Sequence, residues 1–215
     1  MRGRERWPMP ETNRLDEVLS RCAAGAMPTR VAAMHLAATL EVVAALSDWG
    51  LLGLERTVLD IGCGIGRLEA ALSPLSGAVI GLDVSAAMIE QARTRCAGFP
   101  NVRLLLGSGH DLAGIADDSV DLTVLVDTFP CLLLSEGELA ERLLAEIARV
   151  LRVGGDLVIL GFSHRDDVVS ERRDLERLAQ PRGLSLARTV TRACASWDAP
   201  AFHLTKRGSW PACRQ

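Results

Sequence analysis

Three glycines at alternate positions, Gly62, Gly64 and Gly66, separate a short apolar run from a helical pattern that starts at Arg67. The apolar run, residues 57–60, is typical of a buried strand in a parallel sheet. Glycine adopts backbone conformations that other residues avoid, so a glycine-rich turn from strand to helix lets the main chain approach a ligand closely. The stretch therefore predicts an α/β domain with a nucleotide-like cofactor at this turn.

Apolar runs and helical patterns alternate along the rest of the chain. We predict strands at residues 57–60, 78–83, 102–106, 120–126, 156–162, 184–194 and 201–206. We predict helices at residues 13–24, 29–47, 67–73, 85–98, 135–153 and 167–179. Ser85 is the expected N-cap of the fourth helix and Gly98 its C-terminal glycine, while Gly154 and Gly155 are expected to end the fifth. This alternation predicts a mostly parallel, doubly wound sheet with helices on both faces and a ligand site at the carboxyl ends of the strands.

The composition is that of an ordinary globular protein, with 48% hydrophobic and 24% charged residues among 215. The net charge of −3 gives no long-range attraction for a nucleic-acid backbone. The N-terminal stretch has charge but no apolar run after it, so we expect no secretory signal, and no stretch reaches the roughly 18 apolar residues of a spanning helix. We therefore expect a cytoplasmic protein with no nucleic-acid and no membrane partner. Lys206 is the single lysine, and the bias toward arginine favours a GC-rich bacterial genome.

The six cysteines show no metal-binding pattern. No pair has CxxC spacing, and no cysteine–histidine cluster has zinc spacing. We expect reduced cysteines that act as small hydrophobic residues, and we predict no metal site.

The residues around the glycines discriminate between cofactors. The dinucleotide fingerprint GxGxxG would place its third glycine at position 67, where this chain has Arg67. Asp60 lies beside the loop, where a carboxylate repels a pyrophosphate but suits S-adenosylmethionine (SAM), which is cationic overall. Asp83, at the end of the second predicted strand, is placed to accept hydrogen bonds from both ribose hydroxyls. These residues favour SAM, while a purely structural turn and an NAD(P)-binding oxidoreductase stay open as alternatives.

The same segments carry a family resemblance. The stretches VLDIGCGIGRLEAAL, VIGLDVSAAMIEQAR, LLLGSGHDL, DDSVDLTVLVDTF and EIARVLRVGGDLVIL occur in the order and spacing of the class I SAM-dependent methyltransferases. The chain most resembles the branch that acts on small molecules, and the resemblance covers about residues 55–162. It implies a Rossmann-like, seven-stranded, mostly parallel sheet with an antiparallel last strand. It also implies SAM as cofactor and S-adenosylhomocysteine (SAH) as product.

The resemblance further implies a set of cofactor-binding residues. Those matching the loop around the methionine moiety are Asp60, Gly62, Cys63, Gly64 and Gly66. Those matching the adenosine half are Asp83 for the ribose, Val84 and Met88 for the adenine, and Ser108, Gly109 and His110 in the loop after the third strand. The family often has an acid where this chain has Ser108, so the adenine contact passes to the backbone of Gly109 and His110. Met88 has helix-core packing as an equal alternative.

Methyl transfer needs few catalytic side chains. It is an in-line displacement on an activated methyl group, so alignment supplies much of the rate, and a base is needed only for an acceptor that loses a proton early. We predict His164, which follows the fifth strand, as that base, because histidine titrates near neutral pH. Asp127 matches the residue after the fourth strand that often borders cofactor and substrate. It is the second candidate base, with an orienting role as its alternative. His35 and His203 are expected to have structural roles.

We divide the chain into an N-terminal helical cap at residues 1–50, a methyltransferase domain at 51–208 and a tail at 209–215. The expected acceptor is an O, N or C nucleophile of a small organic molecule. Residues 127–130, Asp-Thr-Phe-Pro, lack the order of an acid or Asn, two prolines and an aromatic that nucleic-acid amino methyltransferases carry here. A SAM-binding protein without transferase activity is a further open alternative, and homodimer formation is also left open.

Overall fold

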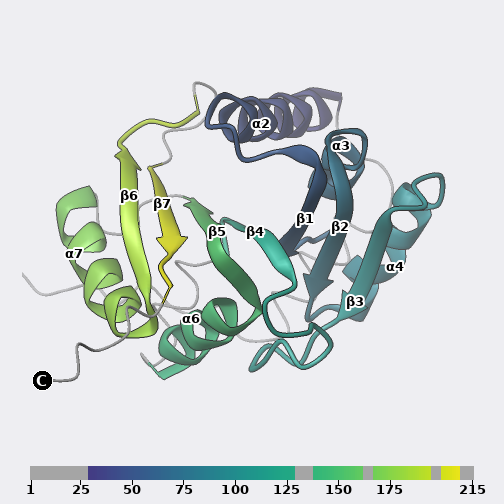
Figure 1. Cartoon of the computed structure of the whole chain (residues 1–215). Coiled ribbons are helices and arrows are strands. Elements are labelled where there is room, and N and C mark those ends of the chain that lie inside the picture. The colour runs from purple at the N-terminus through teal and green to yellow at the C-terminus, as the bar shows by residue number, and fades with distance from the viewer. Residues whose placement is uncertain (1–28, 129–137, 162–166, 195–199, 209–215) are drawn as a thin grey trace, which may run out of the picture.

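A computed structural model describes residues 29–128, 138–161, 167–194 and 200–208, with side chains from residue 35 onward. Its strands form one seven-stranded sheet in the order β3-β2-β1-β4-β5-β7-β6 (Figure 1). The strands are β1 (Gly53–Ile61), β2 (Ser76–Asp83), β3 (Val102–Leu106), β4 (Val120–Val126), β5 (Leu151–Leu160), β6 (Leu184–Val190) and β7 (Ala201–Lys206). The α-helices are α2 (Thr29–Asp48), α3 (Arg67–Leu72), α4 (Ala86–Cys96), α6 (Glu138–Val150) and α7 (Val168–Ala179). Two 3₁₀ turns, η1 (Ser73–Leu75) and η2 (Gln180–Arg182), follow α3 and α7.

The strand pairing confirms the predicted Rossmann-like sheet. Neighbouring strands from β3 to β5 are all parallel, whereas β7 runs antiparallel to both β5 and β6. The chain winds outward from β1 to β3 and then returns to β4 on the other side of β1. Ligands of open α/β sheets bind at such a switch point, outside the carboxyl ends of the strands. Asp60 on β1 and Asp127 directly after β4 lie at this point.

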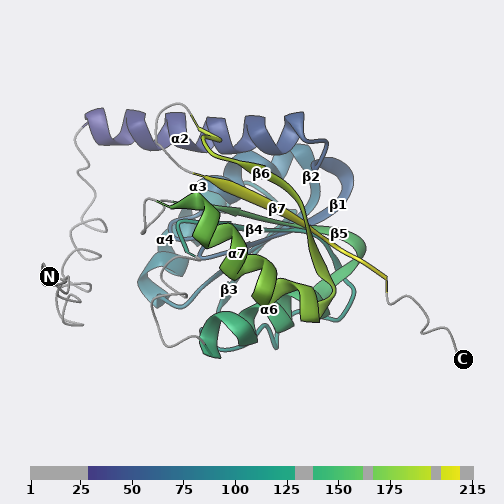
Figure 2. The ribbon, with the colours of Figure 1, turned by 90° about the vertical axis from the view of Figure 1, so that its left-hand side faces the viewer.

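Two hydrophobic clusters occupy the two faces of the sheet, because successive residues of a strand point to opposite sides. Val58 belongs to the cluster that includes Leu46 of α2 and Leu72 of α3. Its neighbour Leu59 belongs to the cluster that includes Ile147 of α6. Figure 2 shows α2 along one side of the sheet and α6 on the other. Asp60 shares the face of Val58 and so points toward the helices α2 and α3.

Two predicted helix ends were wrong. Gly154 and Gly155 lie inside β5 instead of ending α6, because Leu151 already pairs with Val120 of β4 and the sheet takes over the backbone bonds at that point. Helix α4 ends at Cys96 with Ala97 as a right-handed C-cap. A hydrogen bond from Phe99 N to Cys96 O (2.9 Å) closes the following turn, so Gly98 does not provide the left-handed C-terminal residue.

Several predictions fall outside the described residues, namely the helix at 13–24, the start of the helix at Ser135, and His164. Within the described ranges, none of the helices combines the length and the apolar character that crossing a bilayer requires. The same ranges hold no group of three or more His, Cys, Asp or Glu side chains arranged to bind a metal ion.

Candidate functional site

The glycine loop joins β1 to α3 and folds over the end of β2. Gly62, Gly64 and Gly66 all have positive φ angles, of 87°, 55° and 76°. A Cβ at Gly62 would collide with the side chain of Thr128, and one at Gly66 would lie 3.0 Å from Ala92 of α4. A Cβ at Gly64 would meet no protein atom within 4 Å. Protein packing therefore requires glycine at 62 and 66, whereas Gly64 presents its backbone to open space.

Asp83 holds this loop in place from the end of β2. Its Oδ2 accepts a hydrogen bond from the N–H of Gly64 at 2.9 Å, and its Oδ1 accepts one from the N–H of Ser85 at 2.8 Å. Ser85 in turn caps α4 as predicted, since its hydroxyl accepts from the N–H of Met88 at 3.4 Å. The acid predicted to bind the ribose therefore also connects the glycine loop to the start of α4.

Two cavities meet at the switch point and share Gly62 and Asp127. The larger, of about 440 Å³, lies beyond the ends of β1 and β2, and its lining includes Asp83, Val84, Gly109, Asp111, Leu112 and Asp127. The smaller, of about 190 Å³, lies between the loop and α2, and its lining includes Thr39, Val42, Asp60, Gly62, Arg67 and Asp127. Together they form a site with one lobe on each side of Gly62.

The lining of this site is acidic. Among the described residues it holds the four acids Asp60, Asp83, Asp111 and Asp127, against the single cation Arg67. Such a lining attracts a cationic ligand and repels a pyrophosphate. The whole site, and not Asp60 alone, therefore suits a cationic ligand.

The carboxyl group of Asp60, which lines the smaller lobe, has a second buried carboxyl group beside it. Asp60 is 3% exposed, and Glu69 of α3 is fully buried on the same face of the sheet. Burial raises the pKa of Asp60 to about 6, and it raises the pKa of Glu69, with the charge of Asp60 adding to the effect, to about 10. Glu69 is thus the more strongly shifted of the two carboxyl groups.

Glu69 was not predicted as a site residue, although its position in the sequence indicates a buried acid. It lies between Leu68 and Leu72 on the apolar face of the short helix α3, where a charged residue has no access to water.

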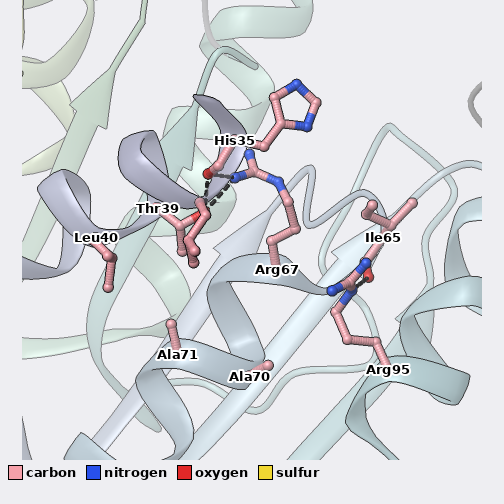
Figure 3. A pocket seen from close by; sticks show the side chains of 9 residues that line it. His35, Thr39, Leu40, Ile65, Arg67, Ala70, Ala71 and Arg95 are labelled. Atoms are coloured by element: carbon pink, nitrogen blue, oxygen red, sulfur yellow. Dashed lines mark hydrogen bonds between the residues drawn. The ribbon is translucent and has the colours of Figure 1, made fainter. Parts of the chain in front are cut away.

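Arg67 connects the glycine loop to α2. Its Nη1 donates to the backbone carbonyl oxygen of His35 at 2.7 Å and to Oγ1 of Thr39 (Figure 3). Burial, and then Arg67, lower the pKa of His35. A third cavity, of about 390 Å³, lies on the outer side of this contact, between α2, α3 and Arg95 of α4. The residue that separates this chain from the dinucleotide fingerprint is thus the one that holds α2 against the loop.

The predicted adenosine-side residues lie close to the larger lobe, but not all of them line it. Val84 is 62% exposed and lines the lobe together with Gly109. Ser108 uses its hydroxyl to accept from the backbone N–H groups of His110 and Asp111, so the side chain shapes the loop. His110 is exposed, Met88 is half-buried, and neither lines the two lobes.

The remaining candidates have the following surroundings. Cys63 lines the smaller lobe although it is largely buried, and burial raises the pKa of its thiol, so that the thiol is neutral. His203 of β7 lies with Nε2 2.8 Å from Oδ1 of Asp156 on β5, inside the sheet. Asp127 is exposed at the junction of the two lobes, with a positive φ of 56°.

Comparisons with known proteins match this architecture. A family model described as a methyltransferase domain matches residues 59–159. The uncharacterized methyltransferase YcgJ of Bacillus subtilis is 31% identical over 179 residues, which cover 75% of this chain and 68% of YcgJ. The chain belongs to the SAM-dependent methyltransferases. SAM is therefore its cofactor, and the acidic site described above fits that group.

Other relatives of this methyltransferase are longer. A demethylmenaquinone methyltransferase of Tropheryma whipplei is 36% identical over 107 residues, covering 50% of this chain and 42% of that protein. A 37.1 kDa protein of transposon Tn4556 from Streptomyces fradiae is 34% identical over 174 residues, covering 77% of this chain and 48% of that protein. The chain thus spans less than half the length of these two relatives.

Solved structures share the fold. A SAM-dependent methyltransferase of Aquifex aeolicus superposes with a TM-score of 0.66 at 23% identity, covering 88% of this chain and 97% of that one. The N-methyltransferase NodS of Bradyrhizobium japonicum, solved with SAH, superposes with a TM-score of 0.67 at 17% identity, covering 89% of this chain and 98% of that one. At this level of identity the likeness establishes the fold alone.

Proposed function

We propose that this protein transfers the methyl group of SAM to a nucleophilic O, N or C atom of a small organic molecule. The observation that carries the proposal is the two-lobed acidic site at the switch point of the sheet. A cofactor that is cationic overall gains from four acids and one arginine, whereas a dinucleotide is repelled by them.

The larger lobe is assigned to the adenosyl half of the cofactor. Asp83 can accept from the ribose hydroxyls while it holds the loop, because a carboxylate offers about four acceptor positions and the two backbone N–H groups use two. Val84 offers exposed apolar surface for the adenine, and Asp111 adds an acceptor at the same lobe. This arrangement compensates for the absence of an acid at position 108.

The smaller lobe is assigned to the methionine half and the acceptor. Asp60, Gly62 and Cys63 line this lobe, and Asp60 is placed to face a cationic group. The next glycine of the loop, Gly64, leaves its backbone open to a ligand. When bound, SAM supplies a methyl group already activated by its positive sulfur. The protein then has to align the acceptor with that methyl group and exclude water.

Helix α2 is proposed as the wall that limits the acceptor to a small molecule. Thr39 and Val42 of α2 line the smaller lobe, and Val42 and Leu46 are buried in the core below it. The C-terminal half of α2 is therefore an integral part of the fold, and the proposed cap at residues 1–50 is anchored there. A wall on this side of the lobe favours a small acceptor over a folded protein or a duplex.

Asp127 is the proposed acceptor-orienting residue or base among the described residues, because it lies where the two lobes meet. His164 remains a proposed base from its place after β5. Turnover of His164→Ala and Asp127→Asn across pH distinguishes them: the variant that loses the pH dependence of the rate identifies the base. Full turnover across pH in both variants would exclude a base at either position.

Calorimetric titration of the purified protein with SAM, SAH and NAD tests the cofactor assignment. We expect SAM and SAH to bind and NAD not to bind, and tight NAD binding without SAM binding would overturn the proposal. A screen of small nucleophiles with methyl-labelled SAM then tests transfer. Label in a small molecule supports the proposed acceptor class, and binding of SAM without transfer to any acceptor class would make this a SAM-binding protein without transferase activity.

A further inference from the structure

Glu69 lies beneath the cofactor loop and forms no ion pair with the described residues. It is fully buried, and its carboxyl lies so close to the backbone of Gly81 on β2 that a Cβ there would be 2.6 Å from Oε1. Among the described residues, no N–H or O–H group makes a well-formed hydrogen bond to either oxygen of Glu69 or to Oδ1 of Asp60. The backbone N–H of Glu69 itself favours the ionised form of its carboxyl, but burial outweighs it. Three buried acceptor oxygens without a donor are costly, since each such group forfeits its hydration.

A proton on one of the two carboxyl groups supplies the missing donor. With the proton on Glu69, its O–H donates to Asp60, and this hydrogen bond keeps the pKa of Asp60 below the value that burial alone would give. If both carboxyl groups were ionised, they would repel each other in this buried setting. If both were neutral, the smaller lobe would lose the negative charge of Asp60. One proton shared by the pair avoids both costs.

None of the charged or titratable groups that surround the carboxyl pair among the described residues neutralises its second negative charge, so one shared proton has to do so. Asp83 on β2 adds negative charge, and Cys63 in the loop and Cys96 on α4 face Glu69 as neutral thiols. Arg67 is the cation whose charge reaches both acids, but its guanidinium donates to α2 instead. Asp127 interacts with Arg67 from the end of β4.

We propose that Glu69 is a positioning residue of the cofactor site: it holds the proton of a buried carboxyl pair, donates it to Asp60, and so keeps Asp60 ionised where it faces the cationic end of SAM. This inference rests on the proposed function, because it assigns Asp60 to the methionine end of SAM. Glu69 acts through Asp60 and does not itself line either lobe.

The affinity for SAM and for SAH, measured by calorimetry across pH, tests the role. The wild-type affinity should fall as the pH drops through about 6, where Asp60 becomes protonated. We call the pH at which the affinity falls in this way the acid edge of binding. Glu69→Leu removes the donor, so the acid edge should move to higher pH. The affinity at neutral pH should fall by about tenfold, which is the contribution of one hydrogen bond to a charged group. Glu69→Gln keeps an N–H donor and should retain the wild-type edge.

A merely structural role for Glu69 predicts a different pattern, in which a variant weakens binding without moving the acid edge. An unmoved edge in Glu69→Leu would therefore overturn the inference, as would a tenfold loss of affinity in folded Glu69→Gln. Glu90→Gln, an exposed change on α4, is the matched control for loss of a carboxyl group, and it should behave as wild type.

A second measurement does not depend on cofactor binding or on the folding of Glu69→Leu. The infrared difference spectrum of wild type minus Glu69→Gln at neutral pH should contain the carbonyl band of a protonated carboxylic acid. Absence of that band would overturn the inference and leave the proposed function standing. Presence of the band in a protein that binds neither SAM nor SAH would instead count against the proposed function.

Discussion

Arg67 donates a hydrogen bond to the backbone carbonyl oxygen of His35 at 2.7 Å, and this contact joins the first turn of α3 to α2 across 32 positions of sequence. The same guanidinium nitrogen donates to Oγ1 of Thr39, whose hydroxyl donates back to the carbonyl oxygen of His35 at 2.7 Å. The three groups form a closed arrangement beside the smaller lobe. The wall of that lobe is thus attached to the residue that directly follows the last glycine of the loop.

The contact between Arg67 and α2 should be visible in stability. We expect Arg67→Ala to lower the free energy of unfolding by about 1.5–3 kcal/mol, the range for hydrogen bonds that involve a charged group. In urea unfolding, Thr39→Val should cost less, and the double variant should cost less than the two singles added together, because they share one interaction. Arg93→Ala, which removes an exposed pair with Glu90, should change stability by no more than about 0.5 kcal/mol. Additive costs for Arg67 and Thr39 would contradict the coupling.

Asp83 should affect both stability and cofactor binding. Asp83→Asn replaces one acceptor oxygen by a donor, so one of the N–H groups of Gly64 and Ser85 loses its partner at a cost of about 1–3 kcal/mol. We expect the SAH affinity measured by calorimetry to fall by about tenfold or more. Ser85→Ala separates the two effects. Losing the cap of α4 should cost about 1 kcal/mol, while SAH affinity stays at the wild-type level. Equal affinity in Asp83→Asn and wild type would refute the ribose assignment.

The substitution Gly64→Ala tests whether the cofactor binds in the open space above the glycine loop. Gly64 and Gly50 both have positive φ, of 55° and 69°, and a Cβ at either position meets no protein atom within 4 Å. Alanine at either position should therefore cost the same backbone strain, about 1–2 kcal/mol by thermal or urea unfolding. SAH affinity should be lost in Gly64→Ala alone, since Gly50 lies in the turn between α2 and β1. Wild-type affinity in folded Gly64→Ala would place the cofactor elsewhere.

The pH dependence of stability should reveal the proton on Glu69. Its pKa is about 10 in the folded protein against an ordinary 4.5, so the unfolded chain loses this proton at a lower pH than the folded one. The contribution is fully present below the ordinary pKa and is lost as the pH rises toward the folded pKa, by up to about 1.4 kcal/mol per pH unit. In urea unfolding between about pH 7 and 9, wild type should lose stability more steeply than Glu69→Gln. Parallel slopes would mean that Glu69 is ionised in the folded state.

Local patterns in the sequence predicted most of the fold. The ranges of β3 and β4 agree with the prediction to the residue, and α2, α3 and α7 agree within one residue, because apolar periodicity and capping residues act over a few neighbours. Asp60 and Asp83 were also assigned to one site from the sequence, since the carboxyl ends of neighbouring parallel strands meet at one edge of the sheet. The error at Gly154 and Gly155 arose because pairing with β4, a contact distant in sequence, outweighed the local glycine signal.

By itself, the sequence determined the order of strands and helices, the glycine loop, and the two acids that favour a cationic adenosyl ligand. These follow from backbone preference, periodicity and charge, which are properties of short segments. Only the tertiary structure decided that Arg67 holds α2, that two lobes meet at Gly62, and that Glu69 lies beside Asp60 without a donor. Each of these depends on which faces pack together, and the proton that we assign to Glu69 depends on the burial that this packing creates.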